Sequence, residues 1–135
     1  MLKLIIGVKG TGKTKPLINM VNTAVENSHG NVVCIEKGVK LRYDVKYRAR
    51  LINTEEYFIS DAKSLYGFLA GILASNHDVT DVFIDSALKI CENDLAGFDT
   101  FVSELDKLVE KVGVNVVVTS SIPTEEASET VKKYI

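Results

Sequence analysis

Four short apolar runs punctuate the chain, at residues 2–6, 32–35, 81–85 and 114–121. Each run contains at least three consecutive apolar residues, with no regular alternation of polar positions. Strands of a parallel sheet are covered on both faces and therefore show this continuous pattern. The runs predict four core strands of a mostly parallel sheet.

The segments between the runs repeat apolar residues every three or four positions, which indicates helices buried along one face. This spacing predicts helices over residues 13–28, 61–75 and 95–112, the last of them stopped by Gly113. Strands that alternate with helices favour an α/β fold with helices on both faces of the sheet. The tail, residues 123–135, predicts one further helix with Thr124 as its N-cap, acidic residues in its first turn and lysines near its end.

Residues 41–51 follow a different rule, because apolar or aromatic side chains alternate strictly with charged ones. Tyr43, Val45 and Tyr47 fall on one side of this alternation, and Arg42 and Lys46 on the other. A period of two is typical of an extended segment with one solvated face. We therefore expect an edge ribbon or hairpin beside the four core strands.

Composition indicates one ordinary globular domain spanning residues 1–135, with 46% hydrophobic and 25% charged residues. The net charge of −2 provides no global positive field for nucleic acid or acidic membranes. The apolar opening reaches a glycine turn too early for a signal peptide, and no segment approaches the ~20 apolar residues of a membrane span, so we expect a cytoplasmic protein. Cys34 and Cys91 are interpreted as reduced thiols, and His29 and His77 lack the neighbours of a metal site.

The sequence "GVKGTGKT", at residues 7–14, matches the pattern G-x-x-x-x-G-K-[ST] between a predicted strand and a predicted helix. Glycines let such a loop turn its backbone N–H groups toward phosphate oxygens, while the following helix adds its positive N-terminal end. The predicted phosphate-binding residues are Gly7, Val8, Lys9, Gly10, Thr11, Gly12, Lys13, Thr14 and Lys15. The other interpretation is an incidental glycine turn. Pro16 lies in the first helical turn and is expected to strain Lys15 away from helical geometry.

A magnesium-bound nucleotide also needs a carboxylate near its phosphates, and Asp85 ends the apolar run "VFI". An acid at the end of a buried strand is costly without a partner such as a metal-bound water. We expect Thr14 and Asp85 to serve the metal, Mg²⁺. Asp85 as a simple cap for the following loop is the competing interpretation.

The order of these motifs resembles the RecA-like branch of the P-loop ATPases, which includes RecA, the hexameric helicases and the KaiC-type proteins. In that branch the magnesium strand often ends in Asp-Ser, as "FIDS" does here, and "LDKLVEKVGVNVVVTSS" is similar to the family's helix, glycine stop and final strand. The resemblance implies a three-layer P-loop NTPase fold, with four core strands, an edge ribbon and helices on both faces. It also requires the strand 114–121 to lie between the strands 2–6 and 81–85.

Members of this branch often carry a water-activating glutamate at the end of the second strand, where "CIEK" places Glu36. The resemblance thus implies Glu36 and Lys13 as catalytic residues, with Thr119, Ser120 or Ser121 sensing the γ-phosphate. Hydrolysis needs a group that orients the attacking water and cations that neutralise developing charge. The competing interpretations are an exposed Glu36 paired with Lys37, and a strand-end hydroxyl cluster without function.

Residues 37–50 contain six basic residues and one acid, with two tyrosines interleaved. Three interpretations remain open: a solvated edge that discourages aggregation, a surface for a protein partner or nucleic acid, or an arginine that reaches the nucleotide of a neighbouring subunit. Stacking on nucleic-acid bases is disfavoured, since the alternation places the tyrosines opposite the arginines. The family's nucleic-acid loops are also short and partly acidic here.

The leading hypothesis is a small ATP-binding protein with weak Mg²⁺-dependent ATPase activity, stimulated by self-association or a partner. A nucleotide-gated switch that hydrolyses nothing alone is the second hypothesis. A small-molecule kinase is disfavoured because residues 86–135 contain no arginine for a lid. No guanine-specifying Asn-Lys-x-Asp motif is present, so ATP is the expected nucleotide.

Overall fold

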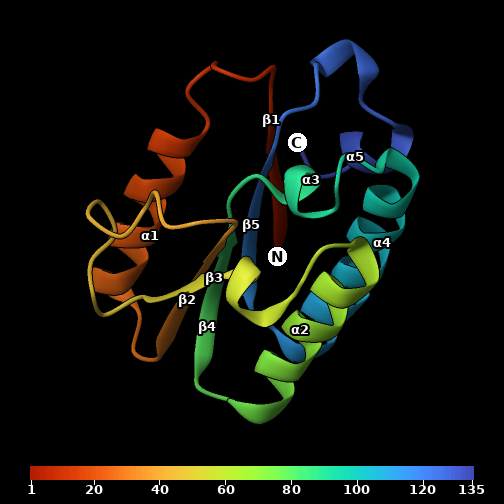
Figure 1. The fold of residues 1–135 in the computed structure, drawn as a ribbon. Helices are drawn as coiled ribbons and strands as arrows, with labels where there is room; N and C mark the ends of the chain where they lie inside the picture. Colours follow the sequence, from red (N-terminus) through yellow and green to blue (C-terminus); the bar gives the residue numbers. More distant parts are fainter.

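The computed structural model describes residues 1–135, which form one five-stranded sheet whose neighbouring strands are all parallel (Figure 1). The strands are β1 (Leu2–Ile6), β2 (Asn31–Glu36), β3 (Arg50–Asn53), β4 (Val79–Ile84) and β5 (Asn115–Ser120). The helices are α1 (Thr14–Asn27), α2 (Ala62–Ser75), α3 (Ala87–Ile90), α4 (Leu95–Val112) and α5 (Glu129–Lys132), with 3-10 turns at Thr54–Tyr57 and Thr124–Glu126. No helix has both the length and the hydrophobicity needed to cross a bilayer.

The strands are arranged in the order β1-β5-β4-β2-β3. The four strands predicted from apolar runs are therefore all present, and β5 lies between β1 and β4, as the predicted order required. Because the strands are parallel, the residues that follow β1, β2, β4 and β5 meet at one edge of the sheet. That edge carries every candidate site residue.

Helices cover both faces of the sheet, which confirms the α/β class (Figure 1). Leu17, Val21 and Val25 of α1 pack on one face against side chains such as Phe83 of β4. On the other face, α2 and α4 enclose the larger core, where Phe98 and other aromatic and aliphatic side chains are fully buried.

The predicted edge ribbon at residues 41–51 is wrong, because residues 37–49 form turns and bends, and the strand that follows them and pairs with β2 is Arg50–Asn53. The N–H of Val45 donates to the carbonyl of Leu41 at 3.0 Å, as expected of a turn and not of a sheet ladder. Leu41, Val45 and Ala49 are the buried residues, so the true period of burial is four. Tyr43 and Tyr47 point to solvent, with 84% and 95% of their surface exposed.

The single C-terminal helix capped by Thr124 is also wrong. Thr124–Glu126 form a 3-10 turn, and α5 begins only after Ser128, whose hydroxyl accepts the N–H of Val131. The interruption is Ala127, which is extended and buried in the core.

The expected departure of Lys15 from helical geometry is likewise absent, since Lys15 lies within α1. Pro16 falls in the first helical turn, where a missing N–H breaks no helical hydrogen bond. The stretch expected as a loop after β4 contains the short helix α3, and most of that helix is buried.

Candidate functional site

The glycine-rich loop, residues 7–14, leaves β1 and enters α1 through backbone conformations that only glycine adopts easily. Gly10 and Gly12 have φ values of +87° and +81°, in the left-handed region that strains other residues. A Cβ at either position would meet no atom within 4 Å, so their backbone conformation is what calls for glycine there. Residues 8–12 are exposed, which leaves the loop open to a ligand.

Hydrogen-bond donors are gathered where this loop meets α1. The backbone N–H groups of residues 12–15 make no hydrogen bond within the chain. The Lys13 ammonium donates to the Val8 carbonyl at 2.9 Å, and this contact holds it across the loop. Unpaired N–H groups at the start of a 14-residue helix, beside a lysine, form a favourable site for an anion.

Asp85 lies beside this donor set, although the two are far apart in sequence. It follows β4, and its N–H donates to the carbonyl of Ile35 in β2 at 2.8 Å. The Thr14 hydroxyl donates to Oδ1 of Asp85 at 3.2 Å, and the Thr119 hydroxyl donates to the same oxygen at 3.0 Å. The structure therefore brings the two predicted metal ligands, Thr14 and Asp85, into direct contact.

Two of the three predicted γ-phosphate sensors are committed to contacts inside the protein. The Thr119 hydroxyl also accepts the N–H of Ser86 at 2.8 Å, and the Ser120 hydroxyl accepts the N–H of Leu88 at 3.3 Å. Thr119 and Ser120 are fully buried, whereas Ser121 is exposed. The strand-end hydroxyls thus hold Asp85 and the start of α3 in place, and only Ser121 faces solvent.

Glu36 is buried at the end of β2, with 2% of its surface exposed. Its Oε1 accepts the N–H of Lys40 at 3.0 Å and its Oε2 accepts the N–H of Leu41 at 3.2 Å. Burial raises the pKa of the Glu36 carboxyl, and these two donors oppose that rise. The interpretation of an exposed acid paired with Lys37 is therefore wrong, because Glu36 is buried and forms no ion pair.

Asn53, at the end of β3, helps to hold the segment beside Glu36 in place, and its role was not predicted from the sequence. Its side-chain oxygen accepts the N–H of Gly38 at 2.8 Å and that of Glu55 at 3.0 Å. It thereby ties the segment after β2 to the 3-10 turn after β3. An asparagine just before Thr-Glu-Glu is a recognisable cap signal, which could have revealed the second contact but not the first.

The residues at this edge of the sheet could supply only part of the coordination of a magnesium ion. The structure contains no group of three or more His, Cys, Asp or Glu side chains able to hold a metal alone. Mg²⁺ is commonly bound by one or two protein oxygens, with phosphate oxygens and waters completing its octahedron. Thr14 and Asp85 match that limited contribution.

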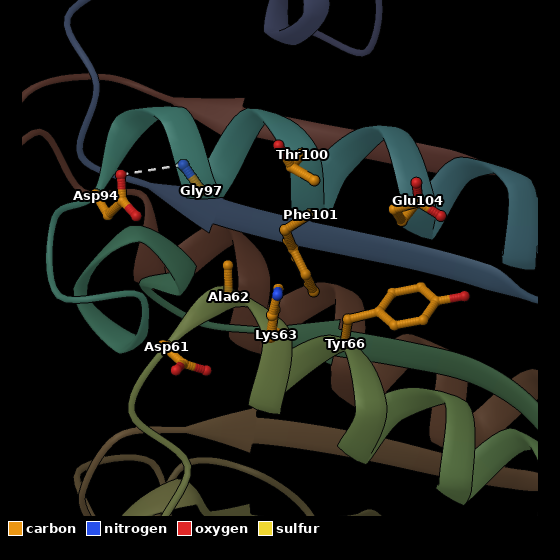
Figure 2. Close-up of a pocket in the computed structure, with 9 residues that line it drawn as sticks. All are labelled: Asp61, Ala62, Lys63, Tyr66, Asp94, Gly97, Thr100, Phe101 and Glu104. Carbon is orange, nitrogen blue, oxygen red and sulfur yellow. Dashed lines mark hydrogen bonds between the residues drawn. The ribbon is translucent and has the colours of Figure 1, made fainter.

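A separate cavity of about 560 Å³ lies between the first halves of α2 and α4, on the face of the sheet opposite α1 (Figure 2). Asp61 and Asp94 stand at its end, and each already caps a helix by accepting the N–H of Ser64 or of Gly97. Since these carboxylates serve the helices and the cavity lies across the sheet from α1, we assign it no part in phosphate binding.

Comparison with known proteins adds no assignment: no protein-family model matches the chain, and no curated protein is significantly similar to it. Function is therefore inferred from the geometry of this edge of the sheet.

Proposed function

We propose that the protein binds a magnesium–nucleoside triphosphate, with ATP the expected nucleotide, at the glycine-rich loop and the ends of β4 and β5. The observation that carries this proposal is the hydrogen bond between Thr14 and Asp85. The sequence predicts both residues as ligands of one Mg²⁺, from two separate motifs. They are 71 positions apart in the chain. An incidental glycine turn offers no reason for that contact.

Each part of the site has a distinct role in this proposal. The N–H groups of residues 12–15 bind phosphate oxygens, and Lys13 exchanges its contact with Val8 for the β- and γ-phosphates. Thr14 and Asp85 supply the protein ligands for Mg²⁺, which neutralises phosphate charge when bound. Thr119 orients Asp85 by donating to its Oδ1.

The strand order supports placing the protein in the RecA-like branch of the P-loop NTPases, because β5 lies between β1 and β4. Fold-level similarity supports a branch but not an activity. Turnover depends on a residue that can orient the attacking water, and Glu36 is the candidate. We therefore keep weak ATP hydrolysis as the proposed activity.

One observation favours the second candidate, a nucleotide-gated switch without hydrolysis of its own. Both oxygens of Glu36 are already bound by backbone N–H groups, and the side chain is buried. Each oxygen keeps a free lone pair, but a water could reach it only if the segment 37–41 that covers Glu36 opened. A partner or a second copy that loosens the segment 37–41 would reconcile this geometry with the proposed stimulation.

The binding proposal is tested by titrating ATP, ADP and GTP with and without Mg²⁺, by calorimetry. Thr14→Val and Asp85→Asn should weaken ATP binding by ~10-fold or more in Mg²⁺ and much less in its absence, because each removes a metal ligand. Thr23→Val is the matched control, since Thr23 is an exposed threonine of the same helix. Unchanged affinity in Thr14→Val, or no binding of any nucleotide by the wild type, would contradict the proposal.

Turnover is tested separately by phosphate release across a range of protein concentrations. The ATPase is supported if the rate of phosphate release per protein molecule rises with protein concentration. That release should disappear in Glu36→Gln while ATP binding persists. Binding without turnover at every concentration supports the switch.

A further inference from the structure

Residues 37–50, which join β2 to β3 and include the first residue of β3, form a basic loop that packs beside α1 (Figure 1). Leu41, Val45 and Ala49 are buried against the core that α1 covers. The Asn22 side chain of α1 donates to the carbonyl of Asp44 at 2.9 Å and accepts the N–H of Lys46 at 2.9 Å. The basic loop is therefore anchored along its length, and its remaining side chains are presented on a defined surface.

That surface combines cations with bare aromatic rings. Because every fourth residue is buried, Tyr43 and Tyr47 share the solvent side with Arg42, Lys46 and Arg48. The expectation that the tyrosines lie opposite the arginines was based on the alternation, which the turns replace. The Arg42 guanidinium lies 4.9 Å from the centre of the Tyr43 ring, and Lys46 and Arg48 flank Tyr47 in the chain.

Most of this positive charge is not neutralised within the protein. Of the six cations in the basic loop only Lys46 forms an ion pair, with Glu26 of α1. Two adjacent hollows of about 400 Å³ and about 290 Å³ run along the loop, and Arg42 and Arg50 line both. The smaller one also carries Glu56, so the larger one is the better site for phosphate.

We propose that the basic loop is a docking surface for single-stranded nucleic acid. Each tyrosine ring with a neighbouring cation matches one base with its phosphate, and this combination binds single strands with little sequence preference. A duplex would keep its bases stacked on one another and leave the rings without a partner. An acidic peptide would pair with the cations, but it would give the two exposed rings no function.

The direct test is fluorescence anisotropy with a labelled oligothymidylate of about 20 nucleotides, in low salt and without ATP. Binding should weaken with salt, with a slope of about −2 in log K against log salt if three arginines contact phosphates. Arg42→Gln/Arg48→Gln/Arg50→Gln should remove most of that slope. The matched control, Lys107→Gln/Lys111→Gln/Lys133→Gln, changes the net charge equally at exposed positions elsewhere and should bind as the wild type does.

The rings are tested by Tyr43→Ala/Tyr47→Ala, which should lower affinity by ~10-fold or more, and by Tyr43→Phe/Tyr47→Phe, which should restore it. Oligothymidylate binding should need neither ATP nor Mg²⁺, so this proposal and the nucleotide proposal fail independently. Absence of binding, equal loss in the lysine control, or no effect of the alanine pair would overturn the inference. Competition by polyglutamate as effective as that by oligothymidylate would overturn it in favour of an acidic protein partner.

Discussion

Glu36→Ala should destabilise the protein by loosening the start of the basic loop. The substitution removes both acceptors of the N–H groups of Lys40 and Leu41, and Leu41 is itself buried. Hydrogen bonds to a charged group contribute ~1.5–3 kcal/mol each. Relief of the buried carboxylate's desolvation offsets part of that loss, which leaves a net cost of about 2–3 kcal/mol.

The assay for this loss is thermal unfolding by far-UV circular dichroism, combined with tryptic cleavage of the native protein. For a domain of this size, a cost of that magnitude lowers Tm by roughly 7–10 °C. The basic loop contains six lysine and arginine residues, so local opening should accelerate cleavage between residues 37 and 50.

Glu26→Ala is the control, because Glu26 also contacts the basic loop, through an ion pair with Lys46 at the surface. An exposed pair contributes less than about 1 kcal/mol, so Tm should move little and cleavage should stay slow. Equal shifts in the two variants, or a Tm change in Glu36→Ala below about 2 °C, would refute the role assigned to Glu36.

Three further predictions concern pH, thiols and glycines. Since the pKa of Glu36 is raised in the fold, the folded state binds its proton more tightly than the unfolded chain does. Part of the stability contributed by this group is therefore lost as pH rises from about 4.5 through the folded pKa. Denaturant titrations across pH should show that loss in the wild type and not in Glu36→Gln. Burial raises the pKa of Cys34 to about 12 and that of Cys91 to about 11. A thiol-reactive dye at pH 8 should therefore label neither thiol until denaturant is added, and rapid labelling of the native protein would contradict their burial. Gly71→Ala, on the exposed face of α2, should raise Tm by a few degrees, whereas Gly113→Ala, at φ +80° after α4, should lower it. Tm shifts of the same sign would contradict the requirement for glycine at position 113.

The elements that sequence predicted well are those whose signals are local. The bounds of α4 match the predicted 95–112 because Asp94 caps its start, Gly113 ends it in the left-handed region, and an apolar stripe runs between them. The core strands could also be predicted from sequence, since short apolar runs that alternate with helices are typical of buried parallel strands. The contact of Thr14 with Asp85 then follows from parallel strands that end at one edge.

The basic loop could not be predicted because its sequence satisfies two patterns at once. Val45 and Ala49 belong both to an alternation with Tyr43 and Tyr47 and to a period of four with Leu41. Tyrosine tolerates either side of such a segment, so the local pattern is undecided. The choice is made by tertiary contacts, chiefly burial against the core beneath α1 and the two hydrogen bonds of Asn22.

Asp85 and Glu36 show why an acid at the end of an apolar strand does not define its own role. Their sequence contexts are alike, but the Asp85 carboxylate is held by the hydroxyls of Thr14 and Thr119, while the Glu36 carboxylate is held by backbone N–H groups. A hydroxyl can rotate and offer its oxygen to a cation, so Asp85 can accept a metal without loss to the fold. The Glu36 carboxylate keeps free lone pairs beyond its two N–H bonds, but it is buried beneath the start of the basic loop, so any water that it activates must enter as that segment opens. If the protein hydrolyses ATP, conditions that raise turnover should therefore also accelerate tryptic cleavage between residues 37 and 50.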